Sequence, residues 1–283
     1  MSYVRKVYEF KNCIEVMDYH TGRHRAPGEK RGKKEKPTPA PMARQNQYER
    51  EKKARHKLRA NFQEGDYFAT FTYARDARPP DMTTAKKHWK DCTDKIREEY
   101  RKRGHELKWM RNIEVGTKNA WHIHAVINRI PDTDIILRKA WKFGKVVSQL
   151  LHEKGAYEEL AAYITKNQDT DPRLKDAKYS TSKNLPVPEP DVKTYLHWRT
   201  WDKEKLRVPK GYYVDPNTFF EGKNPVTGRP YRRYTAIKLP NQKEKKSRGK
   251  KPADRGKTEK RQSVRKQGKN QGRDAPGGEK CSK

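Results

Sequence analysis

Two alternating apolar segments in the middle of the chain restrict its fold more than any other feature. They are residues 106–116 (ELKWMRNIEVG) and 120–128 (AWHIHAVIN), joined by a short polar connection. Side chains along a strand alternate between its two faces, and two such segments with a short polar loop between them are typical of a hairpin. The pattern therefore predicts an antiparallel hairpin whose second strand turns Trp121, Ile123 and Ala125 towards a core.

The opposite face of the predicted hairpin carries a possible metal site. His122 and His124 share that face, and a loop of about three residues places Glu114 opposite one of them. Two imidazoles and one carboxylate with open positions describe a catalytic metal site, and the mixed nitrogen and oxygen set suits Mg²⁺ or Mn²⁺, although such sites also take zinc. A His-x-His pair alone is a weak signal, because it is also found on strands that bind nothing.

A second candidate for chemistry lies at residues 161–167 (AAYITKN), in a stretch with helical composition. Tyr163 and Lys166 are three positions apart and so lie on nearly one face of a helix. A tyrosine there is most often a packing residue, and a lysine is most often solvated. A tyrosine hydroxyl is nevertheless a competent nucleophile on phosphorus, and a neighbouring lysine and metal ion can stabilise the charge that develops.

The order of the predicted elements indicates the fold class. Residues 66–74 are predicted as a strand, followed by a helix that Thr84 caps, the hairpin, a helix over 132–141, a strand over 145–151 and a helix over 156–167. This β-α-β-β-α-β-α order predicts an α+β fold, with a ferredoxin-like (split βαβ) antiparallel sheet and helices packed on one of its faces.

The flanking segments differ in composition from this core. The predicted divisions are residues 1–43 (a strand pair over 3–10 and 14–20, then a basic extended linker), 44–65 (a docking helix with a thin apolar stripe), 66–170 (the catalytic core), 171–240 (a C-terminal extension with a possible DNA-binding hairpin) and 241–283 (a disordered basic tail).

Charge indicates the partner. The 68 Lys and Arg residues outnumber the 36 Asp and Glu, which leaves a formal charge of +32 and predicts binding to nucleic acid. The three cysteines have no spacing typical of a zinc finger or a disulfide framework, so we expect a reducing, cytoplasmic setting. The chain holds no run of eighteen apolar residues, and we expect neither export nor membrane association.

Three motifs in this order resemble those of a known family. FATFTYA (68–74), HIH (122–124) and YITK (163–166) are similar to the motifs of rolling-circle replication initiators of the HUH endonuclease superfamily, especially replication-associated proteins of plasmids, phages and integrative elements of Gram-positive bacteria. The resemblance extends over roughly residues 14–240. Each motif alone is weak, and the ordered set is what makes the resemblance specific.

The resemblance implies DNA cleavage at an origin by transesterification. Tyr163 would attack a phosphodiester in single-stranded or hairpin origin DNA, retain the 5′ phosphate and release a 3′ hydroxyl as a primer. Glu114, His122 and His124 would hold the divalent metal, and Lys166 would assist the nucleophile or position DNA. Tyr157 is too far round the helix to act as a second nucleophile, which implies a single-tyrosine enzyme.

Further partners and contacts follow from the same comparison. No GxxxxGK[ST] motif occurs in the sequence, so a host helicase would unwind the DNA for a host DNA polymerase. Candidate DNA contacts are Thr70, Thr72, Lys178 and Lys183, although the polarity of a sheet face also explains the two threonines. The alternatives are a conjugative relaxase, a single-tyrosine transposase, or a basic nucleic-acid-binding protein without enzymatic activity.

Overall fold

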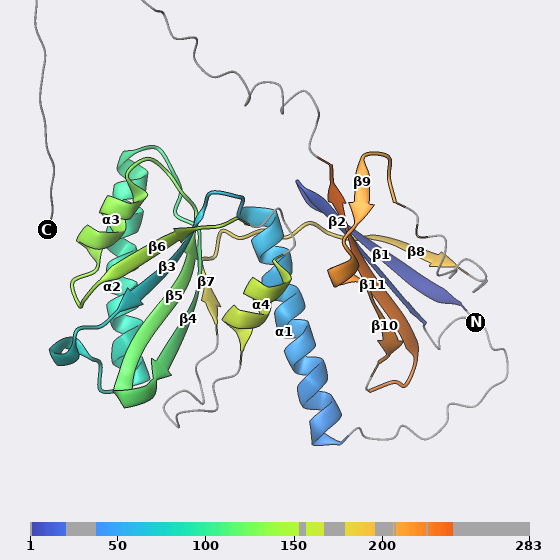
Figure 1. Ribbon diagram of the computed structural model, residues 1–283, viewed down its shortest axis with the longest axis horizontal. Helices are drawn as coiled ribbons and strands as arrows, with labels where there is room; N and C mark the ends of the chain where they lie inside the picture. The colour runs from blue at the N-terminus through green and yellow to red at the C-terminus, as the bar shows by residue number, and fades with distance from the viewer. Residues whose placement is uncertain are drawn as a thin grey trace, which may run out of the picture. The chain divides into compact units, whose positions relative to one another are not determined.

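The computed structural model describes residues 2–20, 38–152, 157–166, 179–195, 206, 208–224 and 226–239. Within these residues the chain forms two antiparallel sheets and four α-helices (Figure 1). The fold is therefore mixed α and β, as the element order predicts. The predicted linker after residue 20 lies largely outside the described residues, and the predicted tail over 241–283 lies entirely outside them.

The first sheet, here called the central sheet, has the strand order β6-β3-β5-β4-β7, and every neighbouring pair is antiparallel. Each element predicted for the core region is present. The strands are β3 (Tyr67–Thr72), β4 (Trp109–Gly116), β5 (Ala120–Ile127), β6 (Val146–Leu150) and β7 (Ser180–Thr181), and the helices between them are α2 (Met82–Lys102), α3 (Thr133–Ala140) and α4 (Glu158–Thr165).

Helices cover both faces of the central sheet, so the predicted packing on one face is wrong. The larger apolar cluster joins α2 and α3 to one face through residues such as Trp89, Ile96 and Leu137. On the other face, Met110 and Val126 pack in a second cluster with residues of α4 and of α1 (Pro39–Asn61). The prediction failed because α1 precedes the core in sequence, and its thin apolar stripe does not reveal which surface it covers.

The second sheet, here called the terminal sheet, combines strands from both ends of the described chain. Its order is β10-β11-β2-β1-β8, with β9 paired to β11. The strands are β1 (Tyr3–Glu9), β2 (Cys13–His20), β8 (Asp191–Tyr195), β9 (Tyr212–Val214), β10 (Phe220–Lys223) and β11 (Pro230–Lys238). The predicted strand pair and the predicted C-terminal hairpin both exist, and the structure pairs them with each other through β2 and β11.

Two helix starts differ from the sequence prediction. The first helix begins at Pro39 rather than at residue 44, because proline is well tolerated at the first position of a helix, where its missing N–H needs no partner. The second is capped by Asp81 rather than Thr84, since the Asp81 carboxylate accepts a hydrogen bond of 2.7 Å from the Thr84 backbone N–H. No helix in the described part of the chain is long and apolar enough to cross a membrane.

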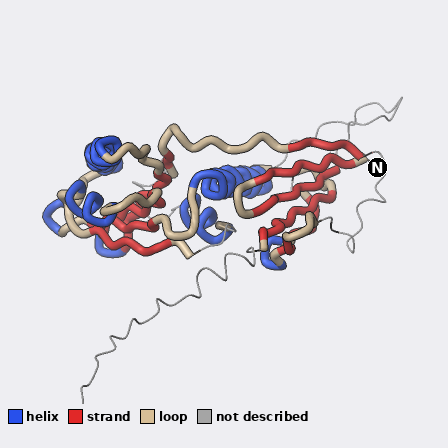
Figure 2. Tube along the Cα trace, turned by 90° about the horizontal axis from the view of Figure 1, so that it is seen from above, coloured by secondary structure: helices blue, strands red, loops and turns tan. Residues whose placement is uncertain are grey.

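Helix α1 lies between the two sheets and joins them through a buried ion cluster (Figure 2). On β2, Glu15 accepts two hydrogen bonds of 2.9 Å from Arg55 and another from Arg59, and His56 Nε2 lies 3.1 Å from the same carboxylate. Glu15 is fully buried. Burial by itself would raise the pKa of Glu15, but Arg55, Arg59 and His56 together hold it well below its ordinary value.

We expect Glu15→Gln to destabilise the fold by about 3–5 kcal/mol, because it leaves two buried arginines without their main counter-charge. Since the folded pKa of Glu15 is depressed, its stabilising contribution is complete above the unfolded pKa of about 4.3 and is lost as the pH falls below that value. Guanidinium denaturation between pH 7 and pH 2 measures both effects, and the variant should lose that part of the pH dependence.

The matched control is Glu99→Gln, which removes an exposed carboxylate that pairs with Lys102 and Arg103 on α2. Exposed ion pairs contribute little, so this variant should unfold almost as the wild type does. Equal destabilisation by the two substitutions would show that the buried cluster does not join the two sheets.

Candidate active site

The hairpin of β4 and β5 places the predicted metal ligands on one face of the central sheet. Glu114 pairs directly with His122, which is one of the two registers that the sequence predicts. On the other side of β5, Thr72 pairs with His122 and Thr70 with His124. Because paired residues in neighbouring strands project to the same side, these five side chains form one continuous polar surface.

The tyrosine of α4 reaches this surface. Tyr163 Oη donates a hydrogen bond of 3.3 Å to Glu114 Oε2, and the same oxygen lies 3.4 Å from His124 Nε2. The Tyr163 ring meets His124 edge to face, with ring centroids 5.4 Å apart. Tyr163 is 38% exposed, so its hydroxyl is held by the cluster while one side of the ring remains open to solvent. The structure thus brings together the phenol, an imidazole and the carboxylate that the sequence analysis selected.

Burial and neighbouring charges shift the pKa values of the cluster. Burial, followed by the negative charge of Glu114, raises the pKa of Tyr163 to about 12. Burial also favours a higher pKa for Glu114, but the hydrogen bond and charge of His124, with smaller effects of Tyr163 and Lys166, lower it below its ordinary value. Glu114 is therefore a carboxylate at neutral pH, and Tyr163 is a neutral phenol.

His122 differs from His124 in its partners. His124 Nδ1 lies 3.1 Å from the Thr70 hydroxyl, which fixes its ring, whereas His122 Nδ1 is buried without a hydrogen-bond partner. Burial lowers the pKa of His122, and the positive charges of His124 and Arg78 lower it further against the opposing effect of Glu114. The neutral imidazole is the form that binds metal ions.

The three predicted metal ligands share one face but do not converge on a single point. No group of three His, Cys, Asp or Glu side chains among the described residues is arranged to hold a metal ion. Glu114 and His124 contact each other directly, and the ring centroids of His122 and His124 are 6.2 Å apart. The donor set and the unpartnered His122 nitrogen fit a divalent ion chemically, but binding requires these side chains to turn towards a common centre.

The remaining predicted residues lie at the rim of the cluster or apart from it. Lys166 is exposed and caps the C-terminus of α4, rather than lying within the helix as predicted. The Thr72 hydroxyl donates 3.1 Å to the Lys145 carbonyl, so it links β3 to the start of β6. Lys183 is exposed after β7, and Lys178 lies outside the described residues. The assignment of Thr70, Thr72, Lys178 and Lys183 to DNA stays a prediction.

Three contributors were missed in the sequence. Asn112 is buried and its amide donates 3.4 Å to Glu114 Oε1, and strand alternation two positions before Glu114 was the signal that could have identified it. Phe68 stacks on His124 with ring centroids 5.8 Å apart and meets Tyr163 edge to face. Arg78 donates 2.9 Å to the Lys118 carbonyl in the hairpin turn, and no local pattern marked it.

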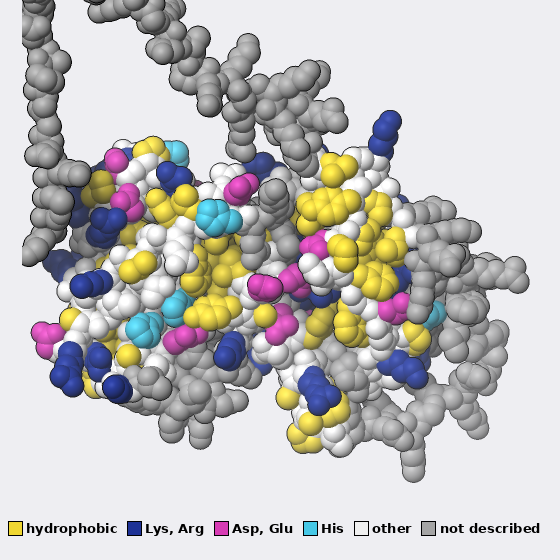
Figure 3. Space-filling model, viewed as in Figure 1, with side chains coloured by type: hydrophobic (Ala, Val, Ile, Leu, Met, Phe, Trp, Pro, Cys, Tyr) yellow, Lys and Arg dark blue, Asp and Glu magenta, His cyan; other side chains and the backbone are white. Residues whose placement is uncertain are grey.

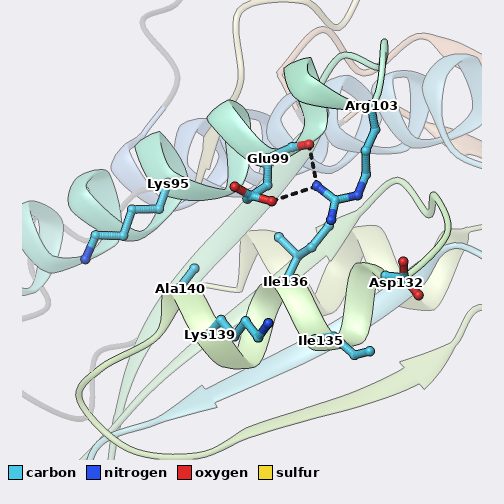
Figure 4. A pocket seen from close by; sticks show the side chains of 8 residues that line it. All are labelled: Lys95, Glu99, Arg103, Asp132, Ile135, Ile136, Lys139 and Ala140. Carbon is cyan, nitrogen blue, oxygen red and sulfur yellow. Dashed lines mark hydrogen bonds and ion pairs between the residues drawn. The ribbon is translucent and has the colours of Figure 1, made fainter.

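The surface supports the polar face of the central sheet as the site. On the side of the molecule shown in Figure 3, histidine, acidic and apolar side chains lie next to one another. A pocket of about 450 Å³ lies elsewhere, between α2 and α3, where Lys95, Lys139 and the Arg103–Glu99 ion pair line it (Figure 4). Because α2 and α3 cover the face opposite to the histidines, this pocket is separate from the candidate site.

Comparison with known proteins adds an independent finding. Residues 66–168 match the family model of the replication-associated protein ORF2, which covers less than half of the chain. This similarity supports a Rep-type replication initiator. Glu114, His122, His124, Tyr163 and Lys166 all lie within the matched residues, whereas α1 and the terminal sheet lie outside them. Searches of curated proteins and of solved structures found no match.

We expect Glu114→Gln to lower the pKa of Tyr163 from about 12 towards 10 in metal-free buffer, because it removes the negative charge that disfavours the phenolate. The pKa should remain above 10, since burial of the phenol is unchanged. Nuclear magnetic resonance titration of protein labelled with ¹³Cζ-tyrosine, with the Tyr163 signal assigned through Tyr163→Phe, measures this value.

Glu159→Gln serves as the comparison, because it removes an exposed carboxylate from the same helix. It should leave the Tyr163 titration as in the wild type. An unchanged Tyr163 pKa in Glu114→Gln would mean that the phenol and this carboxylate do not meet in solution.

Proposed function

We propose that this protein is a single-tyrosine endonuclease and strand transferase of the HUH type that nicks origin DNA to start rolling-circle replication. The observation that carries the proposal is the contact between Tyr163 Oη and Glu114 Oε2, on the hairpin that also bears His122 and His124. The match to replication-associated proteins supports the biological setting. The strand order β6-β3-β5-β4, with α2 and α3 as connections, agrees with a ferredoxin-like split βαβ sheet.

The side chains of the cluster suit an in-line displacement at phosphorus. Tyr163 Oη would form a bond to the phosphorus atom while the bond from phosphorus to the 3′ oxygen breaks. The phenol proton would pass to Glu114 Oε2, and the departing 3′ oxygen would take up a proton to become a hydroxyl. The products are a 5′-phosphotyrosine ester and a free 3′ end. Because the ester is kept, attack by a 3′ hydroxyl reverses the step and joins strands.

Charge beside the phosphate would come from the chain and from a bound ion. Lys166, next to the phenol at the end of α4, would orient the phosphate or stabilise the phenolate. A divalent ion, Mg²⁺ or Mn²⁺ and alternatively zinc, held by Glu114, His122 and His124, would supply further positive charge there. Thr70, through the Nδ1 of His124, would keep that imidazole in its ligand orientation.

The proposed partners are single-stranded or hairpin origin DNA and the host helicase and DNA polymerase. The charge of +32 would supply phosphate contacts without base specificity, so binding should weaken steeply with salt. A conjugative relaxase or a single-tyrosine transposase would use the same chemistry on a different DNA. A binding protein without enzymatic activity would use the charge alone.

We expect Tyr163→Phe to abolish the covalent protein–DNA adduct while DNA binding persists, because the variant loses only the nucleophilic oxygen. Incubation with Mn²⁺ and a labelled single-stranded oligonucleotide from the origin, followed by denaturing electrophoresis, detects the adduct. Tyr157→Phe is the matched control, since that tyrosine is buried in the cluster between α1 and α4. Adduct formation by Tyr163→Phe would identify another nucleophile, and a wild type that binds but never forms an adduct would be a binding protein.

The metal is tested separately. We expect EDTA, or His122→Ala, to slow cleavage by about 100-fold or more, the size of losing a preorganised electrostatic contact to the transition state. DNA affinity measured by fluorescence anisotropy should change little. His105→Ala, which removes an exposed imidazole, should cleave as the wild type does. Full activity in EDTA would exclude a metal-assisted reaction.

A further inference from the structure

We propose that the terminal sheet positions the nucleophile, through an ion pair between Arg233 of β11 and Glu158 of α4. Arg233 Nη1 donates hydrogen bonds of 3.0 and 3.2 Å to the two oxygens of Glu158. Glu158 begins the helix that carries Tyr163 five residues later. The inference rests on the proposed function for its effect on catalysis, but its structural part can be measured without DNA.

Helix α4 receives its support from outside the residues that match the Rep family. It packs on α1, where Ala161 and Ile164 join Ala54 and Leu58 in one apolar cluster. At its far end, the Gln47 amide of α1 lies 3.4 Å from the Thr165 carbonyl. Neither α1 nor β11 belongs to the matched range of residues 66–168. The segment that resembles a replication initiator therefore does not contain the surfaces that hold its own tyrosine helix.

Apolar packing alone leaves the orientation of so short a helix weakly determined. Helix α4 has 8 residues, and its apolar contact is made by small and aliphatic side chains on one side. Glu158 adds a directional restraint, since three guanidinium groups surround its carboxylate: Arg233 at 3.0 Å, Arg59 at 3.3 Å and Arg55 at 3.4 Å. Planar guanidinium groups hold a carboxylate in a defined geometry, which fixes the first turn of α4.

Arg233 is the member of this set that reports on the terminal sheet alone. Arg55 and Arg59 also bind Glu15 and so have a second structural role. Arg233 instead extends from β11 beside Thr235, on the face of the terminal sheet that meets α1. Loss of this guanidinium would let the start of α4 shift. A displacement of about 1 Å at a reacting group can slow a reaction about 100-fold.

The chain offers a matched control one residue away. Arg232 lies on the opposite face of β11, where its Nε donates 2.8 Å to Asp18. Asp18 also pairs with Arg5, so Arg232→Gln weakens the terminal sheet without leaving that carboxylate unpaired. A general loss of stability in the sheet should therefore appear in both variants, whereas a positioning effect should appear only when Arg233 is changed.

The experiment compares full-length wild type, Arg233→Gln, Arg233→Lys, Glu158→Gln and Arg232→Gln. The ¹³Cζ signal of Tyr163, recorded at pH 7 without metal or DNA, reports whether its hydroxyl still meets Glu114. Adduct formation on a single-stranded origin oligonucleotide is measured at saturating DNA, affinity is measured by anisotropy, and thermal denaturation compares stability. Glu158→Gln tests the same pair from the other side if Arg233→Gln does not fold.

We expect Arg233→Gln and Glu158→Gln to move the Tyr163 signal towards its position in Glu114→Gln and to slow adduct formation by about 10- to 100-fold at unchanged DNA affinity. Arg233→Lys should lie between them and the wild type, and Arg232→Gln should match the wild type in both readouts. An unchanged Tyr163 signal in Arg233→Gln, or an equal change in Arg232→Gln, overturns the proposal. A shifted signal in a protein whose wild type forms no adduct supports the positioning role and refutes the proposed function.

Discussion

The ion cluster around α1 is the interaction on which the rest of the structure depends. Glu15 and Glu158 accept hydrogen bonds and charge from the same two arginines of α1, and Arg233 adds a third guanidinium from β11. Glu15 is fully buried, and removal of one partner from a buried ionic group is costly because the remaining charge loses its compensation. The cluster therefore fixes the terminal sheet, α1 and α4 as one arrangement.

That arrangement explains how weak local elements can hold a reactive group. Helix α1 has a thin apolar stripe, α4 is short, and an isolated helix of either kind is marginal in water. Ala54 and Leu58 of α1 bury apolar surface against α4, and Arg55 and Arg59 on the next side of the same helix bind the acids. One helix thus supplies the apolar and ionic contacts that carry Tyr163 to the hairpin.

Composition and site describe different aspects of the same protein. The excess of Lys and Arg implies affinity for a polyanion but no chemistry, whereas the hairpin and α4 supply a nucleophile, a carboxylate and imidazoles. The match over residues 66–168 agrees with the second aspect and stops before the strands that complete the terminal sheet. The elements outside that match are structural partners of the site, since α4 packs on α1 and pairs with β11.

The sequence by itself determined the elements of the central sheet and the face on which Glu114, His122 and His124 lie, because strand alternation and a short hairpin loop are local properties. It also selected Tyr163, but the helix could not show that its hydroxyl meets Glu114. Only the tertiary structure decided that helices cover both faces of this sheet, that β2 and β11 pair across more than two hundred residues, and that Arg233 reaches Glu158. These contacts join segments far apart in the chain, and neither periodicity nor composition carries information about which distant partner a buried charge will find.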